Sequence, residues 1–286
     1  MKLDKDYKCE LINKTLENLK FKGRSDRTLL NYKWTINSFF DNCSYKGNLE
    51  DFTEDDFLNY IRNDLFSKTE SINTYNMHIA AIKIMFLVCF KKTFIDKLIP
   101  HAKAGKRLPV IISKYDFIKI FNSEKKLNHK CWLLLSFCCG LRVSEVATIK
   151  IENINSKEHS LKIIGKGNKE RITILPDLVI KILRIFYKSK NLTKKSGYLF
   201  EGTNNNLHTN SGTIINYFTS LKDKYNLDSR YTFHSLRHSF ATYFLMNGGN
   251  LYDLQHMLGH TSIISTSIYL HLSQNFNNLD GINYEK

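Results

Sequence analysis

Two short stretches of the chain place arginine beside groups that could handle a phosphate. Arg142 follows a Gly that ends an apolar run, and Glu145 lies three residues later. His234 and Arg237 stand three residues apart, which puts both on one face of a helix. A guanidinium grips a phosphate through two parallel hydrogen bonds, a contact that the point charge of Lys cannot make. The two pairs therefore indicate an anion site, although each alone could be a simple ion pair or surface pair.

The scarcity of arginine supports this interpretation. Only nine of the 42 basic residues are Arg, so the chain uses Lys by default. Three more reactive groups follow in order. Lys166 stands between two glycines in a polar loop, His260 follows Gly259, and Tyr269 lies near the C-terminus. Taken singly, Lys166 could be an exposed basic turn and Tyr269 an ordinary core or surface residue.

The composition limits the classes of partner that this chain could bind. The 286 residues carry 42 Lys and Arg against 27 Asp and Glu, a net charge of +15. Such a surplus favours nucleic acid first and an anionic membrane surface second. The longest apolar stretch, Ile79 to Phe90, is interrupted by Lys83 and is too short to span a bilayer. The charged N-terminus has no secretory signal, and six cysteines without CxxC spacing predict free thiols in the cytoplasm and no metal site.

The periodicity predicts a mainly α protein with a small β-hairpin. Residues 1–100 read as a bundle of four helices, one over Lys8–Leu19 and three capped by Ser25, Thr53 and Ser71. Residues 101–109 lack periodicity and predict a linker. Two β-rich runs and a short strand follow, at Leu161–Ile164, Arg171–Leu175 and Tyr198–Phe200. Further helices are expected over Ser113–Phe121, Cys131–Cys139, Asp177–Tyr187, Thr213–Tyr225, Ser235–Met246 and Leu251–Leu258.

In order, the runs GLRVSE, GKGNKER, HSLRHSFAT, LGH and the late IY resemble the signature boxes of the tyrosine recombinase (phage integrase) family. The resemblance covers the whole chain. It implies a helical, SAM-like core-binding domain over 1–100, a linker over 101–109 and a catalytic domain over 110–286. The two domains would close on DNA as a C-shaped clamp.

The resemblance also implies a reaction. Tyr269 would attack the scissile phosphate, forming a 3′-phosphotyrosine and freeing a 5′-hydroxyl, with its pKa near 10 offset by surrounding cations. Arg142 and Arg237 would hold the non-bridging oxygens, with Glu145 orienting the side chains around them. Lys166 would be the general acid, and His260 would donate a hydrogen bond to the phosphate. His234 would position or deprotonate the nucleophile. No metal, cofactor or ATP is implied.

The implied partner is double-stranded DNA at inverted-repeat-like sites. Polar and basic residues on two helices of the first domain and in the linker are the expected contacts: Arg24, Arg27, Asn31, Lys33, Asn73, Asn76, Lys83, Lys103, Lys106 and Arg107. The active form would be a homo-tetramer that passes through a Holliday junction. Residues 275–286 would dock on a neighbouring subunit.

Four functional classes remain open. With no arm-binding domain expected, we favour a minimal integrase of a mobile element, because the junction KRLPVIIS resembles transposon and integron enzymes as well as Xer. An Xer-type chromosome or plasmid dimer resolvase is the main alternative. A type IB topoisomerase would use similar chemistry without a specific site. A DNA-binding regulator would need no nucleophile.

Overall fold

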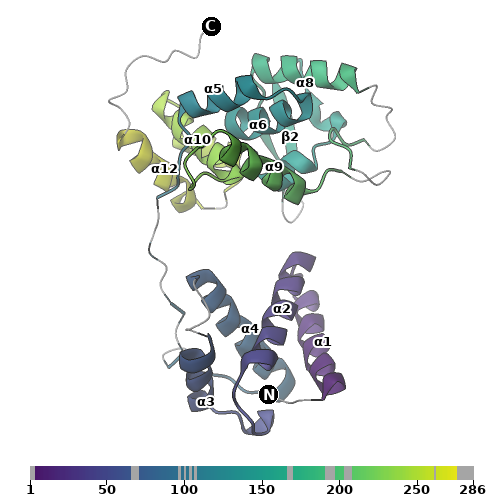
Figure 1. Cartoon of the computed structure of the whole chain (residues 1–286), viewed down its shortest axis with the longest axis vertical. Coiled ribbons are helices and arrows are strands. Elements are labelled where there is room, and N and C mark those ends of the chain that lie inside the picture. Colours follow the sequence, from purple (N-terminus) through teal and green to yellow (C-terminus); the bar gives the residue numbers. More distant parts are fainter. Residues whose placement is uncertain are drawn as a thin grey trace. The chain divides into compact units, whose positions relative to one another are not determined.

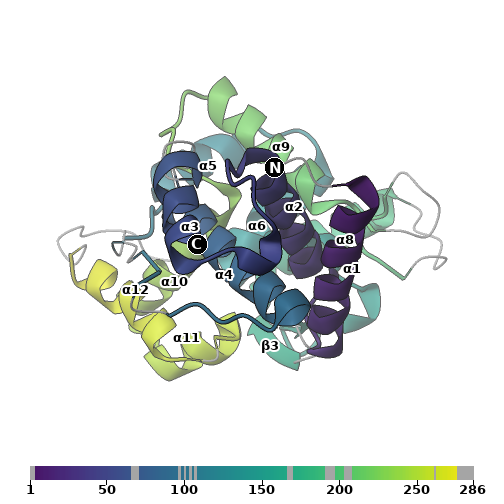
Figure 2. The ribbon, with the colours of Figure 1, turned by 90° about the horizontal axis from the view of Figure 1, so that it is seen from below.

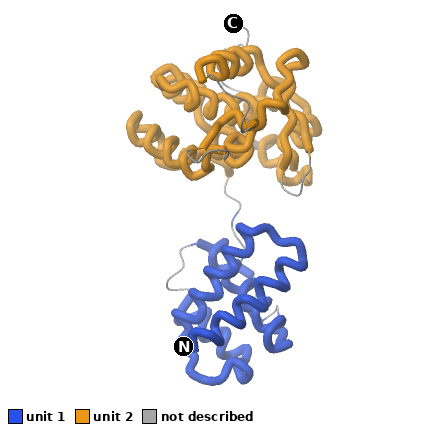
Figure 3. Tube along the Cα trace, turned by 90° about the vertical axis from the view of Figure 1, so that its right-hand side faces the viewer, with its two compact units in different colours: residues 1–106 blue, residues 107–286 orange. Residues whose placement is uncertain are grey.

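The computed structural model divides the chain into two compact units, residues 1–106 and 107–286 (Figures 1 and 3). The division falls inside the expected linker. The structure describes residues 4–65, 71–95, 98–99, 101–102, 105, 108–165, 170–190, 197–202, 208–260 and 262–275. Most of these residues are helical, and the only sheet in the described ranges has three strands.

The first unit is a helical bundle. Its helices are α1 (Lys5–Phe21), α2 (Asp26–Asn42), α3 (Glu54–Asn59) and α4 (Ile72–Phe90), with the short turns η1 (Leu49–Asp51) and π-helical η2 (Tyr60–Leu65). Ser25 accepts a hydrogen bond from the Thr28 amide at the start of α2, and Thr53 forms a capping box with Asp56. The predicted caps at Ser25 and Thr53 are therefore confirmed, and they fix where these helices begin. Ser71 precedes α4 as predicted, but its side chain makes no capping hydrogen bond.

Helix α4 is longer than the apolar run in the sequence suggested. Among the described helices it alone is long and apolar enough to cross a membrane by length and composition. Core helices of folded proteins pass the same test. Here Ile79, Ile82 and Phe86 are fully buried, and α4 packs against α1 and α2. Its apolar face is thus the centre of the bundle.

The second unit surrounds helix α6 with helices and a small sheet (Figures 1 and 2). The expected hairpin is confirmed as antiparallel β2 (Ser160–Ile164) and β3 (Glu170–Ile174), to which β1 (Ile154–Asn155) adds a third strand. The segment expected as a strand at 198–200 makes only an isolated bridge, from Tyr198 to Lys150. The helices are α5 (Lys114–Ser123), α6 (Leu127–Cys139), α7 (Val143–Ala147), α8 (Asp177–Ser189), α9 (Ser211–Lys224), α10 (Phe233–Met246), α11 (Leu251–Leu258) and α12 (Ile264–Asn275).

Three features of this unit bring the sequence motifs together around α10. Helix α6 ends at Gly140, which adopts a left-handed conformation with φ of 69°. The chain then enters the short helix α7, which the sequence did not predict. Helix α12, also not predicted, packs against α10 and α11 (Figure 2). Arg142, Arg237, His260 and Tyr269 thereby come together from four separate segments.

Candidate active site

Arg237 is the most deeply buried charged residue of the candidate site. It lies on α10 and is only 1% exposed. Its guanidinium donates to the carbonyl oxygen of Gly140 and, over 2.7 Å, to that of Leu258. Burial first, and the nearby Arg142 second, lower its pKa to about 9, so the group still carries its charge at neutral pH. Its Nη1 also lies 3.7 Å from Oε2 of buried Glu145, a carboxylate that it shares with other arginines.

Arg142 meets Arg237 at the same oxygen. It stands at the N-cap of α7, and its Nη1 donates to the Leu258 carbonyl over 3.3 Å. Unlike Arg237, its side chain is 37% exposed. Two guanidiniums that converge on one oxygen, one buried and one open, can both reach an incoming phosphate. Their role as a phosphate clamp stays a prediction.

Glu145 connects Arg142 and Arg237 to the sheet through Arg171, a residue to which the sequence analysis gave no role. Arg171 on β3 makes two parallel 2.7 Å hydrogen bonds to its carboxylate, and Arg142 adds one of 2.9 Å. Burial raises the pKa of Glu145, but the bonds and charge of Arg171 outweigh it and hold that pKa below its ordinary value. Three guanidiniums face one carboxylate, which leaves two positive charges in excess.

Arg171 also fixes the loop after α11. Its Nε donates to the Met257 carbonyl over 2.7 Å. A Cβ on Gly259 would lie 2.7 Å from Arg171 Cδ, and Gly259 has a φ of 64°. Glycine at this position therefore lets the loop lie directly on the arginine. The signal in the sequence was the scarcity of Arg, since Arg171 is one of only nine.

Tyr269 lies inside the site and contacts a histidine other than the expected one. It is 3% exposed, and its hydroxyl is 2.8 Å from Nδ1 of His238. Burial raises the pKa of Tyr269 above 10, while Arg237 and Arg142 lower it by less. The two arginines thus favour the phenolate, but in the DNA-free protein its desolvation outweighs them.

His260 is held from both ring nitrogens. Nε2 lies 3.3 Å from Nη2 of Arg237, and Nδ1 lies 2.9 Å from the hydroxyl of buried Thr266. Because a guanidinium only donates, Nε2 accepts here and Nδ1 carries the proton. Burial and the neighbouring arginines lower the pKa of His260 to about 4. Donation from Nε2 to a phosphate would therefore require the other tautomer.

His234 borders the site, where burial first, then Arg237 and Arg142, lower its pKa. His234 is one turn before His238 on α10, and its ring packs edge-on against that of His238 at 4.5 Å between centroids. No contact joins it to Tyr269 among the interactions of the described residues. Lys166 lies outside the described residues, as do Lys103, Lys106, Arg107 and the tail from residue 276 onward.

The predicted DNA contacts of the first unit fall into two groups. Five side chains are exposed on α2, near its start and on α4, which leaves them available to a ligand: Arg24, Arg27, Asn31, Lys33 and Asn73. Asn76 instead exchanges two hydrogen bonds with the backbone of Ala102. Lys83 donates to the Ile99 carbonyl over 2.9 Å. These two residues fasten the segment that leaves α4, a role that their polar side chains did not reveal.

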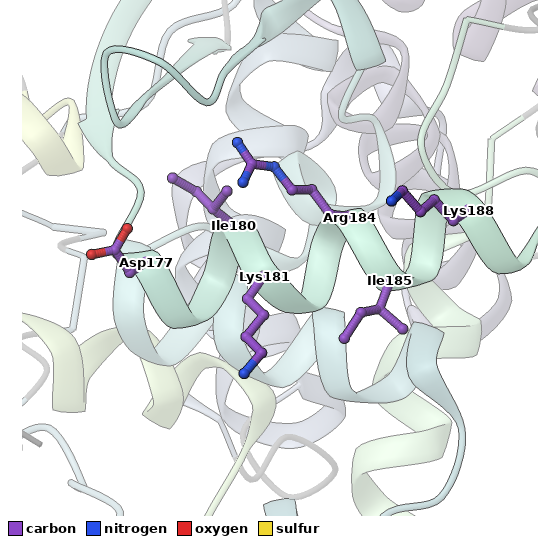
Figure 4. Close-up of a pocket in the computed structure, with 6 residues that line it drawn as sticks. All are labelled: Asp177, Ile180, Lys181, Arg184, Ile185 and Lys188. Atoms are coloured by element: carbon purple, nitrogen blue, oxygen red, sulfur yellow. The ribbon is translucent and has the colours of Figure 1, made fainter.

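A hollow of about 420 Å³ along α8 is a separate feature (Figure 4). It is lined by residues of one helix face: Asp177, Ile180, Lys181, Arg184, Ile185 and Lys188. None of these belongs to the arginine and histidine cluster, and α8 packs against α6 rather than against α10. The chemistry of the unit is therefore concentrated around Arg237 and Tyr269.

The family of this chain is shown by comparison with known proteins. Residues 113–275 match the profile of the Phage integrase family. The chain belongs to this family, the tyrosine recombinases. It is 28% identical to a tyrosine recombinase of Thermosipho africanus over 87% of this chain and 90% of that protein. It is 27% identical to the tyrosine recombinase XerD of Staphylococcus epidermidis over 88% of this chain and 90% of that one.

A solved structure agrees in fold. The Tn1549 transposon integrase, in complex with transposon right end DNA, superposes with a TM-score of 0.73 at 16% identity, covering 93% of this chain and 97% of that one. As a tyrosine recombinase, the protein is a site-specific DNA strand-breaking and rejoining enzyme.

Proposed function

We propose that this recombinase cuts and rejoins double-stranded DNA through a 3′-phosphotyrosine on Tyr269. The observation that carries the proposal is the convergence of Arg142 and Arg237 on one oxygen, next to a buried tyrosine hydroxyl. Attack on phosphorus adds negative charge to the non-bridging oxygens, and two excess positive charges in the site would stabilise it. Since side chains supply this charge, the proposed reaction needs no metal. It needs no ATP because the phosphotyrosine bond keeps the energy of the broken phosphodiester for rejoining.

The proposal also gives roles to the other residues predicted from the sequence. Lys166 would protonate the departing 5′-oxygen, and His260 would bind a non-bridging oxygen. The exposed polar residues of the first unit and the linker, with the net charge of +15, would bind the DNA backbone. Each chain contributes one Tyr269, so exchange between two duplexes would need four copies. We therefore propose that the active form is a tetramer that passes through a Holliday junction, and that residues 275–286 dock on a neighbouring subunit.

The test captures the covalent adduct. Nicked suicide duplexes with a randomised core are incubated with the protein, and adducts are resolved on a denaturing gel and sequenced. Tyr269→Phe should abolish the adduct and keep DNA binding within about tenfold, because only the attacking oxygen is lost. Tyr252→Phe, an exposed tyrosine on α11, is the matched control and should retain the adduct. An adduct that persists in Tyr269→Phe would contradict the proposal.

The sequence of the captured site also separates two biological roles. We propose integration or excision of a mobile element, in line with the fold shared with the Tn1549 integrase. The similarity to XerD of Staphylococcus epidermidis supports an Xer-type dimer resolvase as a second candidate. Captured sites at the ends of a mobile element would support the first role. One site on the chromosome or a plasmid, away from any such element, would support the second.

A further inference from the structure

We propose that His238 is the group that takes the proton from Tyr269 when its oxygen attacks phosphorus. This inference rests on the proposed function and assigns a catalytic residue that the sequence motifs did not single out. The sequence analysis gave the task to His234, which stands four residues earlier. The structure instead places Nδ1 of His238 at 2.8 Å from the tyrosine hydroxyl.

The position of His238 is fixed by packing. Helix α10 lies between α6 and α12, and His238 is half-buried on the side that faces α12. The Tyr269 ring lies between two imidazoles, with centroids 5.7 Å from His238 and 6.4 Å from His260. His260 is already occupied by Arg237 and Thr266. His238 is thus the imidazole whose ring nitrogen is within hydrogen-bond reach of the phenol.

The charged and titratable groups around His238 set its protonation. They are His234 and Arg237 on its own helix, His260 on the loop after α11, and Tyr269 on α12. Burial first, then His234, Arg237 and His260, lower the pKa of His238 to about 4. The ring is therefore neutral at pH 7. With Nε2 protonated, Nδ1 offers a lone pair to the phenolic proton.

A bound phosphate would make this acceptor stronger. Its negative charge would offset Arg237, one of the groups that hold the His238 pKa down. The same phosphate would be the electrophile for Tyr269. Binding of DNA would thus raise the basicity of His238 at the moment when the phenol must lose its proton.

The proposed step balances without a further reactant. A bond forms between Tyr269 Oη and phosphorus while the bond from phosphorus to the 5′-oxygen breaks. The phenolic proton passes to Nδ1 of His238, and the departing 5′-oxygen takes a proton from the general acid, for which Lys166 is proposed. Rejoining runs in reverse, so His238 returns its proton to the tyrosine oxygen.

The test replaces His238 with Asn, whose side-chain oxygen lies near the position of Nδ1 and accepts a hydrogen bond but no proton. Cleavage is measured in single turnover on a suicide duplex first captured with the wild-type protein. At pH 7 we expect His238→Asn to be slower by about a hundredfold or more. Its rate should rise about tenfold per pH unit from 6 to 9, because only the pre-formed phenolate attacks. The wild-type rate should change little over this range.

Three comparisons separate this role from others. His159→Asn is the matched control, because His159 lies in the turn before β2 at a φ of 50° that Asn adopts readily. It should behave as wild type. His234→Asn should be slower yet keep the flat pH profile. A substrate with a 5′-thiol leaving group should not restore His238→Asn, because this group needs no general acid while Tyr269 still needs a base.

The outcomes are distinct. A His238→Asn protein that folds and binds the duplex, yet cleaves within about threefold of wild type, would overturn the inference. A slow variant with a flat pH profile would reduce His238 to a positioning residue and would overturn it as well. Rescue by the thiol substrate would place His238 at the leaving group instead. In each case an adduct that depends on Tyr269 would leave the proposed function intact, and its absence in wild type would overturn that function.

Discussion

Both units have an apolar core, but among the described residues only the second also buries a cluster of charged side chains. In the first unit Phe39, Phe52 and Phe86 are at most 1% exposed, and Phe52 stacks on Phe86 at 4.8 Å between centroids. In the second unit the wall next to Tyr269 buries Arg237 and Glu145. Aromatic packing stabilises without further partners, whereas buried charge is tolerated only when every polar atom is satisfied. The comparison teaches that the second unit must satisfy buried charges, which the described core of the first unit does not contain.

The largest expected effect lies in the aromatic core. Phe52→Ala should destabilise the first unit by about 3–5 kcal/mol, because it removes a ring that touches several others and leaves a cavity. Urea unfolding followed by circular dichroism measures this. Phe21→Ala is the matched control, since Phe21 is 91% exposed, and it should change stability little. Equal losses in both variants would show that the aromatic cluster is not what holds this unit.

In the buried charged cluster of the second unit, a conservative substitution should slow cleavage. Arg237→Lys should slow single-turnover cleavage by about a hundredfold to a thousandfold, because an ammonium cannot donate to the Gly140 and Leu258 carbonyls and also grip a phosphate. Arg184→Lys on the α8 face is the matched control and should cleave normally (Figure 4). Cleavage by Arg237→Lys within about tenfold of wild type would mean that charge alone is sufficient there.

The smallest effect is a pH dependence of the stability of the second unit. His238 and His260 have pKa values of about 4 in the fold against 6.5 ordinarily. The unfolded chain therefore binds more protons between these values, and stability should fall as pH drops from about 6.5 to about 4. Glu145, with a lowered pKa, contributes above its ordinary value and loses that contribution only at lower pH.

Urea midpoints at pH 7.5 and pH 5 measure this dependence. Replacing both His238 and His260 with Asn should reduce the difference between the two midpoints, and His159→Asn should leave it unchanged. An unchanged difference in the double variant would show that these two imidazoles do not titrate with folding.

Much of the architecture was predictable because it is local. The caps at Ser25, Thr53 and Ser113 depend on contacts within three residues, and each forms as expected. The stop at Gly140 and the β2–β3 hairpin are equally local. Helix α12 was missed because its run of Ser, Thr and Ile has little helix propensity, and packing on α10 and α11 stabilises it instead.

For the candidate site, the sequence by itself determined the chemical groups and their order along the chain. Arg142, Arg237 and Tyr269 were identified by residue type and motif. Only the tertiary structure decided which groups touch. It placed Tyr269 against His238 rather than His234, and it brought Arg171 onto Glu145 from 26 residues away. Motif spacing fixes which residues share a helix face, but the angle at which α12 meets α10 depends on packing across the whole unit, and that angle chooses the partner of the tyrosine.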